Sequence, residues 1–287
     1  MRQILTLALC FVSTSIFAQQ HVDAPREDGA TTPLLVYPSA VPTSDCAPLA
    51  VISHGAGGDE NGYRYLAQGM SQMGYTTVVI GHRESGMPVL QEDMRAHGLI
   101  MGVVALVADP YAEGARLMDV GAALKWADGL CHAPFRVLLG HSMGAETVML
   151  EAGARDSILM KPTLTGRSRF DAYVALSPEG PGIVFPDDAW SEIRKPILFM
   201  TGTNDKSLKG GVLARLVPWH DVPGLASQCQ WLGVIDGATH FNFDGSGLGH
   251  ERVEPIVLST IASFLNGVRS GHCTLPAPMN QLTLQAK

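Results

Sequence analysis

A short apolar run at residues 135–139 (FRVLL) leads directly into Gly140-His141-Ser142-Met143-Gly144, and a helix-forming stretch follows at once. A serine on so sharp a turn between strand and helix takes strained backbone dihedrals, and side chains two residues to either side would collide with neighbouring backbone. The two glycines fit a turn that exposes a serine hydroxyl at the end of a sheet. We interpret Ser142 as a candidate nucleophile; the alternative is a small residue in a tight turn.

An aspartate and a histidine, the other two residue types of a serine triad, each follow a later predicted strand. A serine hydroxyl is a poor nucleophile unless a base lies within hydrogen-bond reach, and the base needs an acid to fix its tautomer. Asp205 follows the apolar run at 196–200, and His240 follows the run at 230–235. Both lie just past strand carboxyl ends, the edge where open α/β sheets build their sites. The sequence therefore predicts a triad of Ser142, Asp205 and His240.

The acid is the least constrained of the three residues. Asp205 lies in a polar loop, where aspartate is also common for turn-forming reasons. Glu179 follows the apolar run at 171–176 and is the alternative acid, because some enzymes with such a triad take it from one strand earlier. A capped surface histidine is the alternative interpretation of His240.

A glycine-rich segment, His54-Gly55-Ala56-Gly57-Gly58, follows the apolar run at 49–53. Such a loop lets backbone N–H groups face a substrate carbonyl, and with the N–H of Met143 it would form an oxyanion hole. Ala56 is the predicted second donor. A turn that only needs positive dihedrals is equally compatible with these glycines. For His54 and His141, which flank the same predicted pocket, we expect a supporting role through hydrogen bonds.

The apolar pattern predicts an α/β fold with a mostly parallel central sheet and helices on both faces. Short runs rich in Val, Ile and Leu are typical of strands buried on both faces. They alternate with longer stretches of helical spacing, of which the repeat from Val253 to Val268 is the clearest. Parallel neighbours need a crossover, usually a helix. The predicted strands lie at residues 33–37, 49–53, 76–80, 135–139, 171–176, 196–200 and 230–235.

The chain divides into a leader, one domain and two flanking segments. Arg2 precedes an apolar run that ends at a small residue, Ala18, which indicates a signal peptide over residues 1–18. The run is too short to cross a bilayer as a helix, so we expect cleavage and a secreted or periplasmic protein without a membrane span. Residues 19–31 are predicted as an extension, 32–270 as the domain and 271–287 as a tail. Residues 82–112 fit either a lid or an additional helix.

Composition excludes several functional classes. The formal net charge of −7 argues against a nucleic-acid partner. The histidines show no metal-binding spacing, and phosphate or dinucleotide loops are absent, so we expect no metal and no cofactor. Apart from Cys10 in the leader, four cysteines remain, which makes two disulfides plausible in an oxidising compartment. Three pairings are open to Cys46, Cys131, Cys229 and Cys273.

The segments VISHGAGG, GHSMG, TGTND and DGATHF resemble the α/β-hydrolase superfamily, and within it secreted, dienelactone-hydrolase-like carboxylesterases that include polyester and lipid esterases. The likeness covers roughly residues 33–268. It implies a sheet whose strands run 4-3-5-6-7-8 after the first hairpin, a Ser-His-Asp triad, and hydrolysis of esters of small molecules, lipids or polyesters. True dienelactone hydrolases use a cysteine nucleophile, whereas this chain carries Ser142, so dienelactone is a poor candidate substrate.

The resemblance also implies which cysteines pair and which functions compete. In that strand order Cys46 and Cys131 precede neighbouring strands, and the last helix returns Cys273 to Cys229. The expected activity is cleavage of carboxylic esters through an acyl-enzyme. The alternatives are an amidase, peptidase or lipase using the same triad, or a non-catalytic binding protein with the same fold. The sequence specifies neither the acyl-chain length nor the oligomeric state.

Overall fold

The structure, a computed structural model, describes residues 19–158 and 167–287. The predicted signal peptide lies outside the described residues. Nine strands form one sheet in the order β1-β2-β4-β3-β5-β6-β7-β8-β9. Neighbours from β4 to β8 are parallel, and the strands at each end are antiparallel. The bounds are β1 Gln20–Pro25, β2 Thr31–Tyr37, β3 Leu49–Ser53, β4 Thr76–Ile80, β5 Arg136–His141, β6 Ala172–Leu176, β7 Ile197–Gly202, β8 Gln230–Ile235 and β9 Leu282–Ala286.

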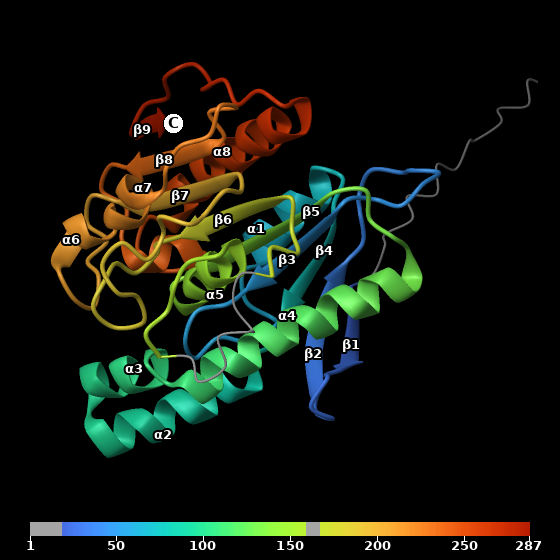
Figure 1. The fold of residues 1–287 in the computed structure, drawn as a ribbon. Helices are drawn as coiled ribbons and strands as arrows, with labels where there is room; N and C mark the ends of the chain where they lie inside the picture. Colours follow the sequence, from blue (N-terminus) through green and yellow to red (C-terminus); the bar gives the residue numbers. More distant parts are fainter. Residues whose placement is uncertain (1–18, 159–166) are drawn as a thin grey trace, which may run out of the picture.

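The sheet has two apolar faces, each covered by helices. Along β3, Val51 packs into one core cluster and Ile52 into the other, because successive side chains of a strand point to opposite faces. Helices α4 and α5 cover the first face, and α1 and α8 cover the second (Figure 1). The predicted α/β architecture is thus confirmed. The helices are α1 Arg64–Gln72, α2 Met87–His97, α3 Leu99–Val107, α4 Pro110–Leu130, α5 Met143–Ala152, α6 Gly211–Ala214, α7 Val217–Asp221 and α8 His250–Ser270, with 3₁₀ turns η1 Arg83–Ser85 and η3 His240–Asp244.

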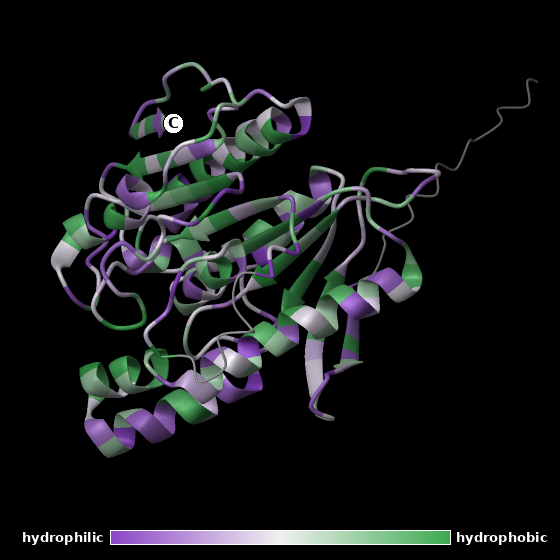
Figure 2. Cartoon of the chain, viewed as in Figure 1, coloured by the Kyte–Doolittle hydropathy of each residue, from purple (hydrophilic) through white to green (hydrophobic). Residues whose placement is uncertain are grey.

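Hydropathy follows these layers closely. In Figure 2 the central strands are mostly apolar, whereas α2 is mostly hydrophilic. Helix α8 forms where the apolar repeat predicts it, and it buries Val257, Ile261 and Phe264 against the sheet. Helix α3 differs, since Leu99, Ile100 and Met101 are all more than half exposed. Among the described residues, no helix combines the length and apolar character needed to cross a membrane.

Two strands lie outside the residues 32–270 that the sequence assigns to the domain. Strand β1 falls in the predicted extension and pairs with β2, and β9 falls in the predicted tail and pairs with β8. Both are edge strands with few buried side chains, so they lack the apolar run by which the inner strands are recognised. The 82–112 segment contains η1, α2, α3 and the start of α4, and a glycine with positive φ, Gly98, separates α2 from α3.

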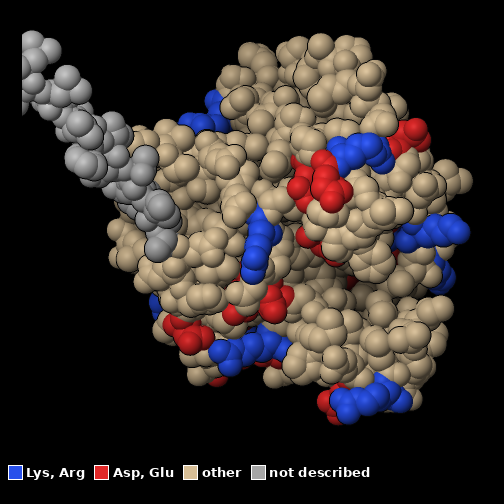
Figure 3. Space-filling model, turned by 180° about the vertical axis from the view of Figure 1, so that it is seen from behind, with Lys and Arg blue, Asp and Glu red and all other residues tan. Residues whose placement is uncertain are grey.

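Two disulfides lie at the same edge of the sheet. Cys46 is joined to Cys131, with Cα atoms 5.8 Å apart, and Cys229 is joined to Cys273, with Cα atoms 5.0 Å apart. This is the pairing that the resemblance implies. Three of the four cysteines lie shortly before β3, β5 or β8, so both bridges lie at the edge opposite the strand carboxyl ends. On the face shown in Figure 3, charged side chains of both signs are scattered without a patch of one sign.

Candidate active site

Ser142 occupies the sharp turn between β5 and α5. Its backbone has φ 57° and ψ −123°, a strained conformation for a residue with a side chain. A Cβ on Gly140 would collide with the carbonyl of Gly144, and a Cβ on Gly144 would collide with the carbonyl of Ser53 on β3. Both glycines are therefore required by close backbone approach, as the sequence predicts.

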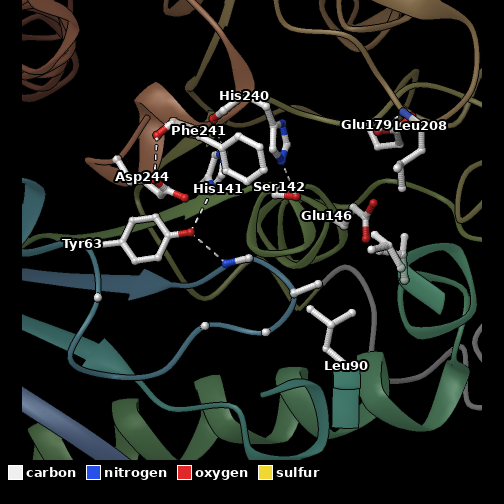
Figure 4. A pocket seen from close by; sticks show the side chains of 18 of the residues that line it. Tyr63, Leu90, His141, Ser142, Glu146, Glu179, Leu208, His240, Phe241 and Asp244 are labelled. Atoms are coloured by element: carbon white, nitrogen blue, oxygen red, sulfur yellow. Dashed lines mark hydrogen bonds between the residues drawn. The ribbon is translucent and has the colours of Figure 1, made fainter. Parts of the chain in front are cut away.

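His240 reaches Ser142 from the turn that follows β8. Its Nε2 atom lies 3.0 Å from Ser142 Oγ (Figure 4). Its Nδ1 atom lies 3.3 Å from Oδ1 of Asp205. His240 is the first residue of η3, which is held by a capping box between Thr239 and Asn242. The structure thus brings together Ser142, His240 and Asp205.

Asp205 is fully buried and supplied with donors. Thr201 Oγ1 donates to its Oδ2 at 2.9 Å, and Arg215 Nε lies 3.2 Å from its Oδ1. Burial acts to raise the pKa of Asp205, but the hydrogen bond from His240 and the charge of Arg215 outweigh it, so the pKa is lowered. The group is a carboxylate at neutral pH.

Glu179, the alternative acid, is held elsewhere. Arg215 Nη1 donates to its Oε2 at 2.9 Å, and the backbone N–H groups of Leu208 and Lys209 point to the same carboxylate. Within the described parts of the chain, Glu179 makes no hydrogen bond to His240. Geometry therefore favours Asp205 over Glu179 as the partner of the imidazole.

The glycine-rich loop after β3 leaves one amide free. The N–H of Gly55 donates to the Tyr63 hydroxyl, that of Gly57 to the carbonyl of Ser85, and that of Gly58 to the carbonyl of Gly55. The N–H of Ala56 has no partner among the described residues, and Ala56 lines the cavity beside Ser142. The N–H of Met143 lies at the N-terminus of α5, where helices leave their first amides unpaired.

His54 and His141 support this loop and the turn that carries His240. His54 Nδ1 lies 2.6 Å from the carbonyl of Gly55, and its Nε2 accepts the backbone N–H of His82. His141 Nε2 lies 3.0 Å from the carbonyl of His240, and its Nδ1 lies 2.8 Å from the Tyr63 hydroxyl. Burial lowers the pKa of both rings well below the usual value, so both are neutral supports.

Arg116 holds the glycine-rich loop after β3 through hydrogen bonds, and it was not predicted from the sequence. It is fully buried on α4, and its guanidinium donates to Ser53 Oγ at 3.1 Å, to Ser85 Oγ at 2.5 Å and to the carbonyl of His54. Its Nε donates to Thr147 on α5. One side chain thus joins the end of β3, η1 and the helix that begins after Ser142. Arginine at a helical position otherwise reads as solvated, which is why the sequence gives no signal for it.

A cavity of about 730 Å³ opens above Ser142. One wall comes from α2 and α3 through Met87, Leu90, Val103 and Val107, so the segment that the sequence left open as a lid or a helix forms a wall. Phe241 and Leu208 stand at the mouth, 60% and 42% exposed. Glu146 lines the interior. Within the described residues, no cluster of three His, Cys, Asp or Glu side chains is arranged to hold a metal ion.

Only the comparison with solved structures found similar proteins. No protein-family model matches the sequence, and the comparison with curated proteins likewise found no match. A protein provisionally named a dienelactone hydrolase, from Klebsiella pneumoniae, superposes with a TM-score of 0.63 at 16% identity over 87% of this chain and 98% of its own. The esterase Est1E from Butyrivibrio proteoclasticus gives 0.57 at 17% identity, over 88% of this chain and 99% of its own.

A third solved structure has the same fold. An α/β serine hydrolase without a lid, from Xanthomonas campestris, gives a TM-score of 0.55 at 14% identity over 91% of this chain and 98% of its own. Together these likenesses show that the chain has the α/β-hydrolase fold. The sheet order β4-β3-β5-β6-β7-β8 that the resemblance implies is the order observed.

Proposed function

We propose that this protein is a serine hydrolase that cleaves carboxylic esters through an acyl-enzyme. The observation that carries the proposal is the 3.0 Å approach of His240 Nε2 to Ser142 Oγ, with Asp205 on the other side of the ring. An ionised Asp205 favours the tautomer with the proton on Nδ1, which leaves Nε2 free to accept the serine proton. The fold and its likeness to esterases support the same conclusion.

The reaction proceeds in two steps, acylation of Ser142 and then hydrolysis of the acyl-enzyme. Ser142 Oγ attacks the ester carbonyl while His240 takes its proton, and the N–H groups of Ala56 and Met143 stabilise the oxyanion. Collapse breaks the ester bond, and His240 returns the proton to the departing alcohol. Water then attacks the acyl-serine with His240 again as base, and the carboxylic acid leaves as Ser142 regains its proton.

Ser142→Ala tests the assignment directly. We expect the variant to keep the melting temperature of the wild type within a few degrees but to lose at least about 10³-fold in kcat on p-nitrophenyl butyrate, since nucleophile removal abolishes the covalent route. A fluorophosphonate probe should label the wild type at Ser142 and leave the variant unlabelled. Activity retained at a tenth of the wild-type rate would reject Ser142 as the nucleophile.

Two alternatives remain to be separated by experiment. Esters and amides share the tetrahedral intermediate, so the same residues would serve an amidase, a peptidase or a lipase. Matched p-nitrophenyl esters from acetate to palmitate and the corresponding p-nitroanilides distinguish these activities. A non-catalytic binding protein with this fold would resist the fluorophosphonate probe altogether.

We propose further that the protein works outside the cytoplasm. The two disulfides support this location, because such bridges persist in oxidising compartments. The predicted signal peptide over residues 1–18 points the same way. Mass spectrometry of protein recovered from the periplasm or the medium tests it, and the expected mature N-terminus is Gln19.

A further inference from the structure

Glu146 is a buried carboxyl group inside the cavity with no role in the proposed reaction. It lies one helical turn after Ser142 on α5, and its backbone N–H donates to the carbonyl of Ser142 at 3.2 Å. Residues four apart on a helix share a face, so its side chain stands beside the nucleophile. Figure 4 shows the carboxyl directed into the cavity, which it lines although the residue is only 2% exposed.

One oxygen of this carboxyl group has no hydrogen-bond partner among the described residues. Its Oε2 atom is buried and has no hydrogen bond within the described parts of the chain. The two guanidinium groups nearby donate to other acceptors: Arg116 to Ser53, Ser85, Thr147 and the carbonyl of His54, and Arg215 to Glu179 and backbone carbonyls. The Nε atom of Arg215 forms an ion pair with Asp205. Buried polar groups in folded proteins are otherwise hydrogen-bonded, so an orphan aimed into a cavity indicates a ligand.

The surroundings of Glu146 favour the neutral acid. Burial is the main cause that raises its pKa well above the usual value, and the carboxyl groups of Glu113 and Glu179 add to it. Arg116 and Arg215 act in the opposite direction and are outweighed. The wall across the cavity, from α2 and α3, is apolar and offers no charge. A protonated carboxyl presents one O–H donor and one carbonyl acceptor.

We propose that Glu146 is a specificity-determining residue that hydrogen-bonds a hydroxyl group of the substrate, so that the preferred substrates are hydroxyl-bearing esters rather than plain alkyl esters. The inference rests on the proposed ester hydrolysis and deepens it. A hydroxyl both donates and accepts, which matches a neutral carboxyl better than an ether or an ammonium group does.

Matched substrates and two variants test the assignment. Ethyl butyrate, ethyl 3-hydroxybutyrate and 2-hydroxyethyl butyrate place a hydroxyl on neither side, the acyl side or the alcohol side of the ester. We expect the wild type to prefer one hydroxylated ester over ethyl butyrate by about tenfold or more in kcat/KM, measured by pH-stat at pH 7. Glu146→Leu, of similar size, should bring that ratio near one, whereas Glu146→Gln should retain most of it.

Each outcome decides the matter. A wild-type ratio near one, or a ratio that Glu146→Leu leaves unchanged, overturns the proposal. Preference for an ammonium-bearing ester that is lost in Glu146→Gln would show an ionised carboxylate and also overturn it. The ratio in the wild type should fall as pH rises through the pKa of Glu146, and in Glu146→Gln it should not. Near-UV circular dichroism checks that both variants fold.

A binding measurement separates this proposal from the proposed function. Failure of the wild type to hydrolyse any ester counts against ester hydrolysis alone. Calorimetric titration of Ser142→Ala with the same three esters then reads the preference without turnover. A hydroxylated ester should bind about tenfold tighter than ethyl butyrate, and adding Glu146→Leu should remove the difference. Equal affinities in Ser142→Ala would overturn the role of Glu146.

Discussion

Asp205 and Glu146 are two buried carboxyl groups on opposite sides of Ser142, and their pKa values shift in opposite directions. Asp205 receives donors from Thr201 and His240 and faces Arg215, whereas Oε2 of Glu146 receives none within the described residues. Burial penalises the charged form of both. Hydrogen-bond donors therefore decide which acid is charged, so the acid next to His240 favours the anion and the acid next to the cavity favours the neutral form.

The largest expected effect is the loss of kcat when the ionised Asp205 is replaced. Asp205→Asn should lower kcat on p-nitrophenyl butyrate by about 10³–10⁴, because an amide no longer fixes the Nδ1–H tautomer of His240. Glu179→Gln is the matched control, since Glu179 contacts Arg215 but not His240, and it should cost less than about tenfold. A larger loss in Glu179→Gln than in Asp205→Asn, at unchanged melting temperature, would mean that Glu179 serves as the acid.

The second effect concerns the stability of the folded protein, to which the hydrogen bonds of the buried Arg116 guanidinium should contribute. Arg116→Met should lower the free energy of unfolding by about 3–5 kcal/mol, because several buried acceptors lose their donor together. Arg155→Met is the control: Arg155 pairs with Asp188 at the exposed surface, where an ion pair contributes about 0–1 kcal/mol. Urea unfolding measures both. A loss below about 1 kcal/mol for Arg116→Met would show that the network contributes little to stability.

The smallest expected effect is on the pH dependence of stability, through the buried carboxyl group of Glu113. Burial raises the pKa of Glu113 to about 7, so the folded protein keeps this acid neutral after the unfolded chain has ionised it. Its contribution to stability is present below pH ~4.3 and is lost as pH rises towards 7. Glu113→Gln keeps the bond from Thr147 but cannot ionise, so relative to the wild type it should gain up to about 3 kcal/mol between pH 5 and pH 8.

Urea unfolding at both pH values measures that gain. Asp205 provides the opposite sign, since a lowered pKa gives stability that is lost as pH falls. A wild type and a Glu113→Gln variant with parallel pH profiles would contradict an elevated pKa for Glu113.

Local pattern predicts the parts of this molecule that depend on neighbours in sequence. The turn around Ser142 is recognisable because its glycines flank it at fixed spacing, and the inner strands because both of their faces are buried. Asp205 and His240 could be placed because each follows such a strand. Their meeting with Ser142 is seen in the structure, and their catalytic roles stay predictions.

Residues whose role depends on tertiary packing could not be found in this way. Arg116 and Glu113 share one face of α4 at a spacing that is typical of a solvated stripe, yet both are fully buried. Glu146 is hidden similarly, because a glutamate in a helix gives no sign that a cavity lies beside it. Strands β1 and β9 pair mainly through backbone hydrogen bonds, which carry no side-chain pattern.

Strand β9 covers the outer edge of β8, and it is a short strand without a fully buried side chain. An outer strand with unpaired backbone groups is a template for another chain, and β8 would present such an edge if residues 282–286 were removed. Strand β8 is almost wholly buried and carries the turn with His240, so its exposure would endanger solubility and chemistry together. We therefore expect shortened versions of this chain that lack β9 to oligomerise through the exposed edge of β8.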